Sequence, residues 1–587
     1  MRDAIVVGAG GGGAVVAKEL AAQGLDVLLL EAGARNADVE TGWTHFEIDQ
    51  TNPLSGALRF GPADRTKSPW TRELAQNSFL WQCSGVGGTT QHYFANCPRA
   101  YPGVFADYGG ADAAAYDRAH AFPFAYRDLI PYYEWVEETL PVQTAAMGTK
   151  EEIFLGAAGR LGLPVQRSKN STGAAYRPQE NAILQPSGTA GKTDDPKKLV
   201  YPEAKGCTFC GHCLQGCKEP LRAPRNLKAK RSTDASYVPM ALTADAWSRG
   251  GRAVNLMADA YVVRVDTVAG AATGVTWRSG DGGELHSEEA RVVVLAAGAV
   301  ETPRLWMNSG LPNPNGWVGR GLTDHYFDIV VGLMPFETGI FRGPSSAARV
   351  DFPGRGSIEN TGAPPATLAF SSLLSDSGIA GYYDNGSPVT AQGADSVGRA
   401  VGRNFKAFLA NASHVLTALA ITDDDVESHN RVLLSGAFPP DEHGPVPRVE
   451  VAHRARSART NANREFLVRK SVDLLRAAGA VAVSRVNWAP LLLHIQSSMR
   501  MGASAADSVL DASGEARAVP RLFVADNSAL ANGCGGVNPT LTTQALATRT
   551  AERIFARYFG GDPWVADGAP VSSIDAVVTH AVLRRGL

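Results

Sequence analysis

Four cysteines lie within one short segment of the chain. The segment CTFCGHCLQGC places Cys207, Cys210, Cys213 and Cys217 at intervals of three, three and four residues. This C-x2-C-x2-C-x3-C spacing is the run by which bacterial ferredoxins bind iron–sulfur clusters. Structural zinc more often uses two C-x-x-C pairs separated by a longer loop, and disulfides between such near neighbours are strained. The spacing therefore predicts an iron–sulfur cluster, with four unmetallated thiols as the alternative.

The role of Cys217 decides which cluster is expected. In two-cluster ferredoxins the fourth thiol of such a run serves the other cluster. Here the chain has a single run, and Lys218 replaces the usual proline. Three ligands would hold a [3Fe-4S] cluster, whereas a fourth thiol from Cys217 would complete a [4Fe-4S] cluster. The residues themselves leave both open.

A glycine-rich turn near the N-terminus has the spacing of a phosphate-binding loop. The apolar run at 4–8 predicts a buried parallel strand, and Gly8, Gly10 and Gly13 open the helix that follows it. In such a turn the first glycine permits the bend, the second lets the backbone approach a pyrophosphate, and the third lets helix and strand pack closely. Glu31 ends the next apolar run, about 20 residues on, where an acid binds a ribose diol. The pattern predicts a dinucleotide cofactor, NAD or FAD.

Several later segments resemble the glucose–methanol–choline (GMC) oxidoreductase family. They occur in the order of that family, and the resemblance runs from Met1 to about Phe555. The resemblance implies FAD as the cofactor. The matching segments are GVGGTTQHY (85–93), LAAGAVETPRLWMNSG (295–310), VGRGLTDHY (318–326), NRVLLS (430–435) and the stretch from RLFVADNSAL to TAERI (521–554).

The same resemblance implies an α/β fold with two interwoven domains. A Rossmann-like FAD-binding domain is expected to alternate along the chain with an α+β substrate domain built on an antiparallel sheet. The FAD-binding domain would comprise residues 1–100, 200–325, which carry the cysteine run, and 487–560. The substrate domain would comprise 101–199 and 326–486, and 561–587 would form a C-terminal tail.

The segment LLLHIQSSMRMG (491–502) resembles the active-site pattern of the family. His494 takes the position of its catalytic histidine, and Asn538 takes that of the second active-site residue. Ser497 and Ser498 depart from the pattern, where Gly-Thr is usual. The implied chemistry is reasonable, because histidine can accept a hydroxyl proton while an amide stabilises the developing alkoxide. A buried core histidine and a helix N-cap would be the non-catalytic explanation of the two residues.

The flavin contacts implied by the resemblance are spread over the whole chain. His92 resembles a family histidine that links covalently to FAD in some members and not in others, so the linkage is open. The full set is Gly8, Gly10, Gly13, Glu31, Gly87, Gly88, Thr89, His92, Val263, Ala297, Gly298, Asp526, Pro539 and Thr540.

Together these features predict an FAD-dependent dehydrogenase that oxidises the CH–OH group of a sugar, glycoside or other alcohol. Hydride would pass to flavin N5, and electrons would leave through the cluster to a cytochrome c-type acceptor, with a small partner subunit as a further candidate partner. Similarity to multi-subunit glucose dehydrogenases of the family favours [3Fe-4S]. The alternatives are an O2-using alcohol oxidase with unmetallated cysteines, and a non-catalytic flavoprotein subunit for electron transfer or assembly.

Composition limits the binding partners and the cellular location that the sequence predicts. The 587-residue chain has a formal net charge of −2, which gives no electrostatic case for nucleic acid. It has no apolar run long enough for a transmembrane helix. It opens with MRDAIVVGAG, which has no basic region followed by an apolar one. The sequence therefore predicts a cytoplasmic protein, and a periplasmic one only if a signal-bearing partner exports it.

Overall fold

The computed structural model describes most of the chain. The described residues are 1–35, 60–64, 66–74, 79–163, 165–166, 175–176, 179–190, 195–373, 390–398, 400–452, 456–486 and 491–587. The start of the third predicted flavin segment, 487–490, lies outside them. No helix within these ranges is both long and apolar enough to cross a membrane.

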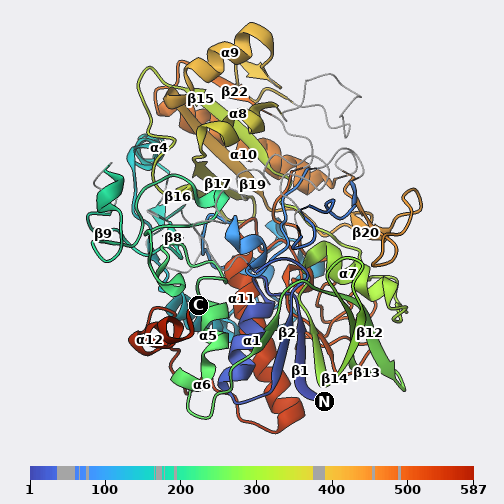
Figure 1. The fold of residues 1–587 in the computed structure, drawn as a ribbon. Coiled ribbons are helices and arrows are strands. Elements are labelled where there is room, and N and C mark those ends of the chain that lie inside the picture. The colour runs from blue at the N-terminus through green and yellow to red at the C-terminus, as the bar shows by residue number, and fades with distance from the viewer. Residues whose placement is uncertain are drawn as a thin grey trace.

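The first sheet has seven strands and contains the N-terminus (Figure 1). Its parallel part is buried on both faces, which explains the unbroken apolar runs at 4–7 and 27–30. The helices α1 (Gly13–Ala22) and α11 (Thr540–Ile554) lie side by side against it, although they come from opposite ends of the chain. The parallel strands are β1 (Arg2–Val7), β2 (Val27–Leu30), β11 (Asn255–Met257), the second half of β14 (Leu285–Leu295) and β24 (Leu522–Val524); β12 (Ala260–Val268) and β13 (Ala271–Ser279) extend the sheet antiparallel to β14.

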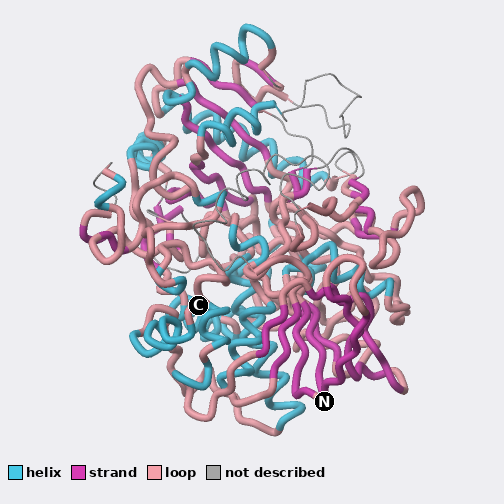
Figure 2. The backbone as a smooth tube through the Cα atoms, in the orientation of Figure 1, coloured by secondary structure: helices cyan, strands magenta, loops and turns pink. Residues whose placement is uncertain are grey.

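The second sheet has six strands and occupies the other half of the molecule (Figure 2). It is antiparallel except where β18 joins β22. One face packs on α10 (Ala458–Ala477), and α4 (Thr149–Arg160) contacts both that helix and β16. The strands, in sheet order, are β16 (Ser346–Phe352), β17 (Gly356–Thr361), β19 (Val415–Thr422), β15 (Asp328–Leu333), β22 (Ala482–Arg485) and β18 (Ser396–Val397).

Alternation along these strands sorts their side chains between two faces. On β15 and β19, Val330, Ala418 and Ala420 join the core beneath α10, whereas Ile329 and Leu419 belong to a separate apolar cluster on the opposite face. This is the period-two pattern of a strand. The second face of the sheet is therefore available to line a site.

Shorter elements connect the two sheets. The helix α7 (Gly298–Asn308) follows β14, and β23 (Leu491–Leu492) pairs with β4 (Phe79–Leu80) just before His494. Three further strands form one small sheet: β3 (Glu73–Leu74), β20 (Arg431–Leu434) and β21 (Pro447–Glu450). Two-residue strands pair as β5 (Gln143–Thr144) with β8 (Glu180–Asn181), β6 (Val165–Gln166) with β7 (Ala175–Tyr176), and β9 (Ser187–Gly188) with β10 (Ala204–Lys205). The other described α-helices are α3 (Ile130–Thr139), α5 (Tyr237–Leu242), α6 (Ala244–Trp247), α8 (Pro365–Leu373), α9 (Gly402–Ala410) and α12 (Ala576–Arg585).

The predicted fold class is confirmed: a parallel α/β sheet is combined with a second, antiparallel sheet in one chain.

Candidate active site and the thiol loop

One cavity of about 330 Å³ is lined by residues of both sheets. It brings together residues from the whole length of the chain. Of the residues predicted to bind flavin or to act in catalysis, only Gly13 and Gly87 do not line it. Those that do are Gly8, Gly10, Glu31, Gly88, Thr89, His92, Val263, Ala297, Gly298, His494, Asp526, Asn538, Pro539 and Thr540.

The glycines of the first turn differ in what surrounds them. A Cβ on Gly13 would lie 1.9 Å from the carbonyl oxygen of Gly8, and one on Gly12 would lie 1.6 Å from that of Ala525. These two glycines are required by packing. A Cβ on Gly10 would come no nearer than 3.8 Å to its neighbours, so it would fill cavity space rather than clash. That is the cradle a pyrophosphate needs at a helix N-terminus. Gly12 was not predicted, although the run of four glycines was its signal.

Glu31 is buried and held by the backbone. Its carboxylate accepts hydrogen bonds from the backbone N–H groups of Ala9, Gly33 and Gly85, at 2.8, 2.9 and 3.0 Å. Burial nevertheless raises the pKa of the carboxyl above its usual value. A carboxylate offers about four lone-pair sites, so roughly one remains for a ribose hydroxyl.

Val263 lies at an irregularity in its strand. The pairing of β12 with β13 runs from Val262 opposite Trp277 directly to Arg264 opposite Thr276, so Val263 falls outside the register. A bulged residue of this kind leaves its backbone N–H and C=O unused by the ladder. Since Val263 also lines the cavity, those groups are suited to bind the edge of a planar ligand such as a purine.

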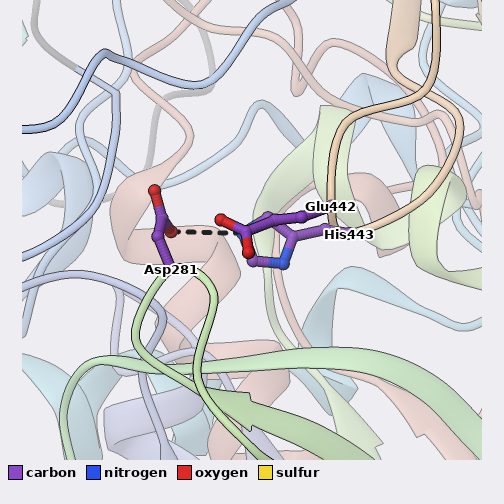
Figure 3. A group of neighbouring side chains, drawn as sticks. All are labelled: Asp281, Glu442 and His443. Carbon is purple, nitrogen blue, oxygen red and sulfur yellow. Dashed lines mark hydrogen bonds and ion pairs between the residues drawn. The ribbon is translucent and has the colours of Figure 1, made fainter.

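Asp281, Glu442 and His443 form the only group of three potential metal ligands found within 4.8 Å of one another in the described chain (Figure 3). His443 Nε2 lies 3.3 Å from Asp281 Oδ1, and Trp70 Nε1 donates to that same oxygen at 3.2 Å. The ring of His443 stacks on Tyr261 with centroids 3.8 Å apart. Since His443 and Tyr261 both line the cavity, this group holds a flat aromatic wall at one edge of it.

His494 forms a hydrogen-bonded pair with a second histidine. Its Nδ1 lies 3.0 Å from Nδ1 of His325, which is fully buried in the loop that precedes β15. His325 has φ of +64°, a backbone conformation that a non-glycine residue rarely adopts and that clusters at functional sites. The sequence segment containing His325 was recognised, but its contact with His494 was not predicted.

The hydrogen bonds of His325 determine the tautomer of His494. Nε2 of His325 lies 2.7 Å from the carbonyl oxygen of Gly533, which can only accept, so Nε2 carries the proton. The Gln496 amide nitrogen lies 2.8 Å from the same nitrogen, and the Gln496 amide oxygen is buried without a hydrogen-bond partner among the described residues. We therefore assign the amide with its oxygen toward Nε2 of His325, where it can accept. Nδ1 of His325 is left as an acceptor, and Nδ1 of His494 must donate to it. The lone pair of His494 is therefore on Nε2.

Both histidines are kept neutral by their surroundings. Burial lowers the pKa of His325 to about 4. Burial, and then the nearby charges of His325 and Arg349, lower the pKa of His494 well below its usual value. At neutral pH His494 is thus an uncharged imidazole, which is the form that can accept a proton.

Asn538 is oriented by charged residues on the second sheet. Arg349 donates to Oδ1 of Asn538 at 3.0 Å, and the Asn538 side chain also hydrogen-bonds to the Glu359 carboxylate. Arg349 can only donate and Glu359 can accept, so the amide Nδ2 is directed toward Glu359. One of the two Nδ2 hydrogens remains for a ligand in the cavity. Arg349 and Glu359 were not predicted from the sequence, because they are far from Asn538 along the chain.

Asp526 connects three chain segments. Its carboxylate accepts from the Gly298 backbone at 2.8 Å, from the Thr302 hydroxyl at 2.6 Å, and from both the backbone and the hydroxyl of Ser528. Burial raises the pKa of Asp526, and these donors oppose the rise. With its lone pairs used in this way, Asp526 positions the turn at Gly298, and Pro539 caps α11 at the same cavity.

A second, small cavity is lined by all four cysteines of the run: Cys207, Cys210, Cys213 and Cys217. Among the described residues no three of them lie within 4.8 Å of one another. Around one zinc ion two sulfurs can be at most about 4.6 Å apart, because each Zn–S bond is about 2.3 Å. The spread therefore does not match a single tetrahedral ion. Burial raises the pKa of Cys207 and Cys217 above the usual value of a thiol.

The thiol loop, residues 207–217, is bonded directly to the predicted flavin loop, residues 85–93. His92 Nδ1 donates to the Leu214 carbonyl at 2.7 Å, and burial lowers the pKa of His92 to about 3. The buried ammonium of Lys230 donates to the carbonyl oxygens of Gln91 at 2.7 Å, Tyr93 at 3.1 Å and Cys213 at 2.6 Å. One lysine thus holds both loops together.

Comparison with known proteins agrees with this arrangement. Two family models, both described as GMC oxidoreductase, match residues 172–327 and 427–547. The chain is 28% identical to 6'''-hydroxyparomomycin C oxidase of Streptomyces lividus, over 94% of this chain and 91% of the relative. It is 23% identical to the fructose dehydrogenase large subunit of Gluconobacter japonicus, over 94% and 97%. The crystal structure of pyridoxine 4-oxidase from Mesorbium loti shares the fold, with a TM-score of 0.59 at 15% identity, over 94% and 99%.

Proposed function

Since the chain belongs to the GMC oxidoreductase family, which implies FAD and oxidation of CH–OH groups, we propose that it is an alcohol dehydrogenase with His494 as its base. The observation that carries the proposal is the histidine pair, which leaves a neutral Nε2 lone pair on a residue that lines the cavity. FAD, when bound, supplies the hydride acceptor at N5.

The residues of this chain would act on the hydroxyl group of the alcohol. Nε2 of His494 takes the hydroxyl proton, and His325 stabilises the resulting imidazolium by accepting from its Nδ1. The remaining Nδ2 hydrogen of Asn538 donates to the same substrate oxygen and stabilises the developing alkoxide. Arg349 and Glu359 keep that amide from rotating.

Reduction of bound FAD by an alcohol in the absence of oxygen tests this assignment. His494→Ala should retain FAD but slow flavin reduction by roughly 100- to 10,000-fold, the usual contribution of a general base. Unchanged reduction in this variant would instead favour the non-catalytic flavoprotein subunit.

We further propose an iron–sulfur cluster on the thiol loop, with [3Fe-4S] favoured over [4Fe-4S]. The ferredoxin-like spacing supports it, as does the shared cavity of the four thiols. The bonds of Lys230 and His92 to the flavin loop would place the cluster beside FAD. Electrons would then pass to a cytochrome-type acceptor. One relative is named as the large subunit of fructose dehydrogenase, which favours a small partner subunit for this chain as well.

Iron and acid-labile sulfide, measured after anaerobic purification, test for the cluster. An oxidised [3Fe-4S] cluster is paramagnetic whereas [4Fe-4S]2+ is silent, so electron paramagnetic resonance also shows whether Cys217 is a ligand. Less than about one iron per chain would reject both forms. A relative named as an oxidase favours the O2-using alternative, which predicts peroxide formation on addition of substrate.

A further inference from the structure

The side of the cavity formed by the second sheet presents hydrocarbon side chains. Ile329 and Val331 of β15 and Leu419 of β19 face it by strand alternation, and Val486, which follows β22, bonds through its backbone to Ile329 at 2.8 Å. His494 lines the same cavity, as do its chain neighbours Leu491 and Leu493. The other described apolar residues lining this side are Trp81, Phe94, Ile340, Leu368, Leu491 and Leu493.

The threonine hydroxyls on these strands are already used within the protein. Thr417 donates to the carbonyl oxygen of Thr361, and the two hydroxyl oxygens lie 2.9 Å apart in a shared hydrogen bond. Asn96 donates one of its two amide hydrogens to Glu359 at 2.9 Å, which leaves the second hydrogen and the amide oxygen for one hydroxyl group. Together with the catalytic pair, His494 and Asn538, this side can therefore bind one or two hydroxyl groups.

A polyhydroxylated ligand would leave several hydroxyls against apolar side chains. Each hydroxyl brought from water without a partner lowers affinity, and the discrimination for one such group reaches roughly 10- to 100-fold. A sugar ring carries several of these groups. A hydrocarbon ring or chain carries none beyond the reacting carbinol, and it gains from apolar burial.

We propose that the substrate is an alcohol whose carbon skeleton is predominantly hydrocarbon, such as a cyclic aliphatic or aromatic alcohol, and not a sugar. The inference rests on the proposed function. The O–H proton goes to His494, the C–H hydride goes to FAD, and the alcohol becomes an aldehyde or ketone while FAD takes up two electrons.

Compounds with the same ring size but different hydroxyl content provide the test. Cyclohexylmethanol and 4-tert-butylcyclohexanol offer a primary and a secondary carbinol, and methyl glucoside offers both kinds on a six-membered ring. Anaerobic stopped-flow reduction of the FAD-loaded protein should give an apparent Kd at least about tenfold lower for the hydrocarbon alcohols. Reduction by the glucoside at equal or lower Kd overturns the substrate inference alone. No reduction by any of the three overturns the proposed function as well.

A matched pair of variants tests the apolar lining directly. Val486→Thr places a hydroxyl of similar size on the half-buried cavity side chain, and Val577→Thr makes the same change at a position of α12 that is 53% exposed. Val486→Thr should raise the apparent Kd for cyclohexylmethanol about fivefold and reduce the rise in melting temperature that this alcohol produces. Val577→Thr should change neither. An unchanged Kd and an unchanged temperature shift in Val486→Thr contradict the proposal.

Discussion

Replacing His325 with phenylalanine tests whether this residue fixes the tautomer of the base. The variant keeps an aromatic ring but removes the acceptor at Nδ1, 3.0 Å from Nδ1 of His494. The His494 N–H group is then buried without a partner, at a cost of about 1–3 kcal/mol. Because about 1.4 kcal/mol corresponds to a tenfold change in rate, flavin reduction should slow roughly 5- to 150-fold.

Stopped-flow bleaching of FAD under anaerobic conditions measures this rate, with FAD content and melting temperature recorded for each variant. His325→Gln retains an oxygen acceptor and should recover part of the rate. His286→Phe is the matched control, because His286 is an exposed residue of β14 that does not line the cavity. A rate within twofold of the wild type refutes the tautomer argument.

Three further predictions follow from the cavity and the thiol loop. Gly10→Ala should fold with an unchanged melting temperature but bind FAD at least about tenfold more weakly. Gly12→Ala should fail to fold, because its Cβ would lie 1.6 Å from a carbonyl oxygen. If the two variants behave alike, Gly10 does not leave space for the pyrophosphate. The rate of flavin reduction should stay constant as pH falls past about 6.5, the ordinary value for histidine, and decline only at lower pH, since His494 must be unprotonated and its pKa is lowered; a midpoint at or above that value would count against it. Lys230→Met should lower the free energy of unfolding by at least about 2 kcal/mol, because it leaves three buried carbonyls without their donor, while Lys470→Met at a partly exposed ion pair should lower it by less than about 1 kcal/mol; urea denaturation measures both.

The parts of the site that could be predicted from the sequence are local in the chain. The turn at Gly8 and Gly10 combines a buried strand, a helix start and a spacing within a few residues. His494 and Asn538 each stand in a short segment whose residue pattern is distinctive. The motif at 318–326 likewise drew attention to the loop of His325.

The remaining features depend on contacts between distant segments. His325 meets His494 across 169 residues, and Arg349 meets Asn538 across 189. No short pattern records such a pair, because each partner alone looks like an ordinary core or loop residue. The omission of Val263 from the strand register is also invisible in its sequence, since the segment reads as a continuous strand.

The position of Lys230 has a consequence for how the protein matures in the cell. Its ammonium joins Cys213 to Gln91 and Tyr93, so the wall beside the flavin cannot be completed until the cysteine segment has taken its shape. Under the cluster proposal above, the thiol loop would have to be assembled before FAD is held tightly. Cultures starved of iron should then yield a paler protein with less flavin as well as less metal, and oxidative damage to the cysteines should release FAD from the assembled protein.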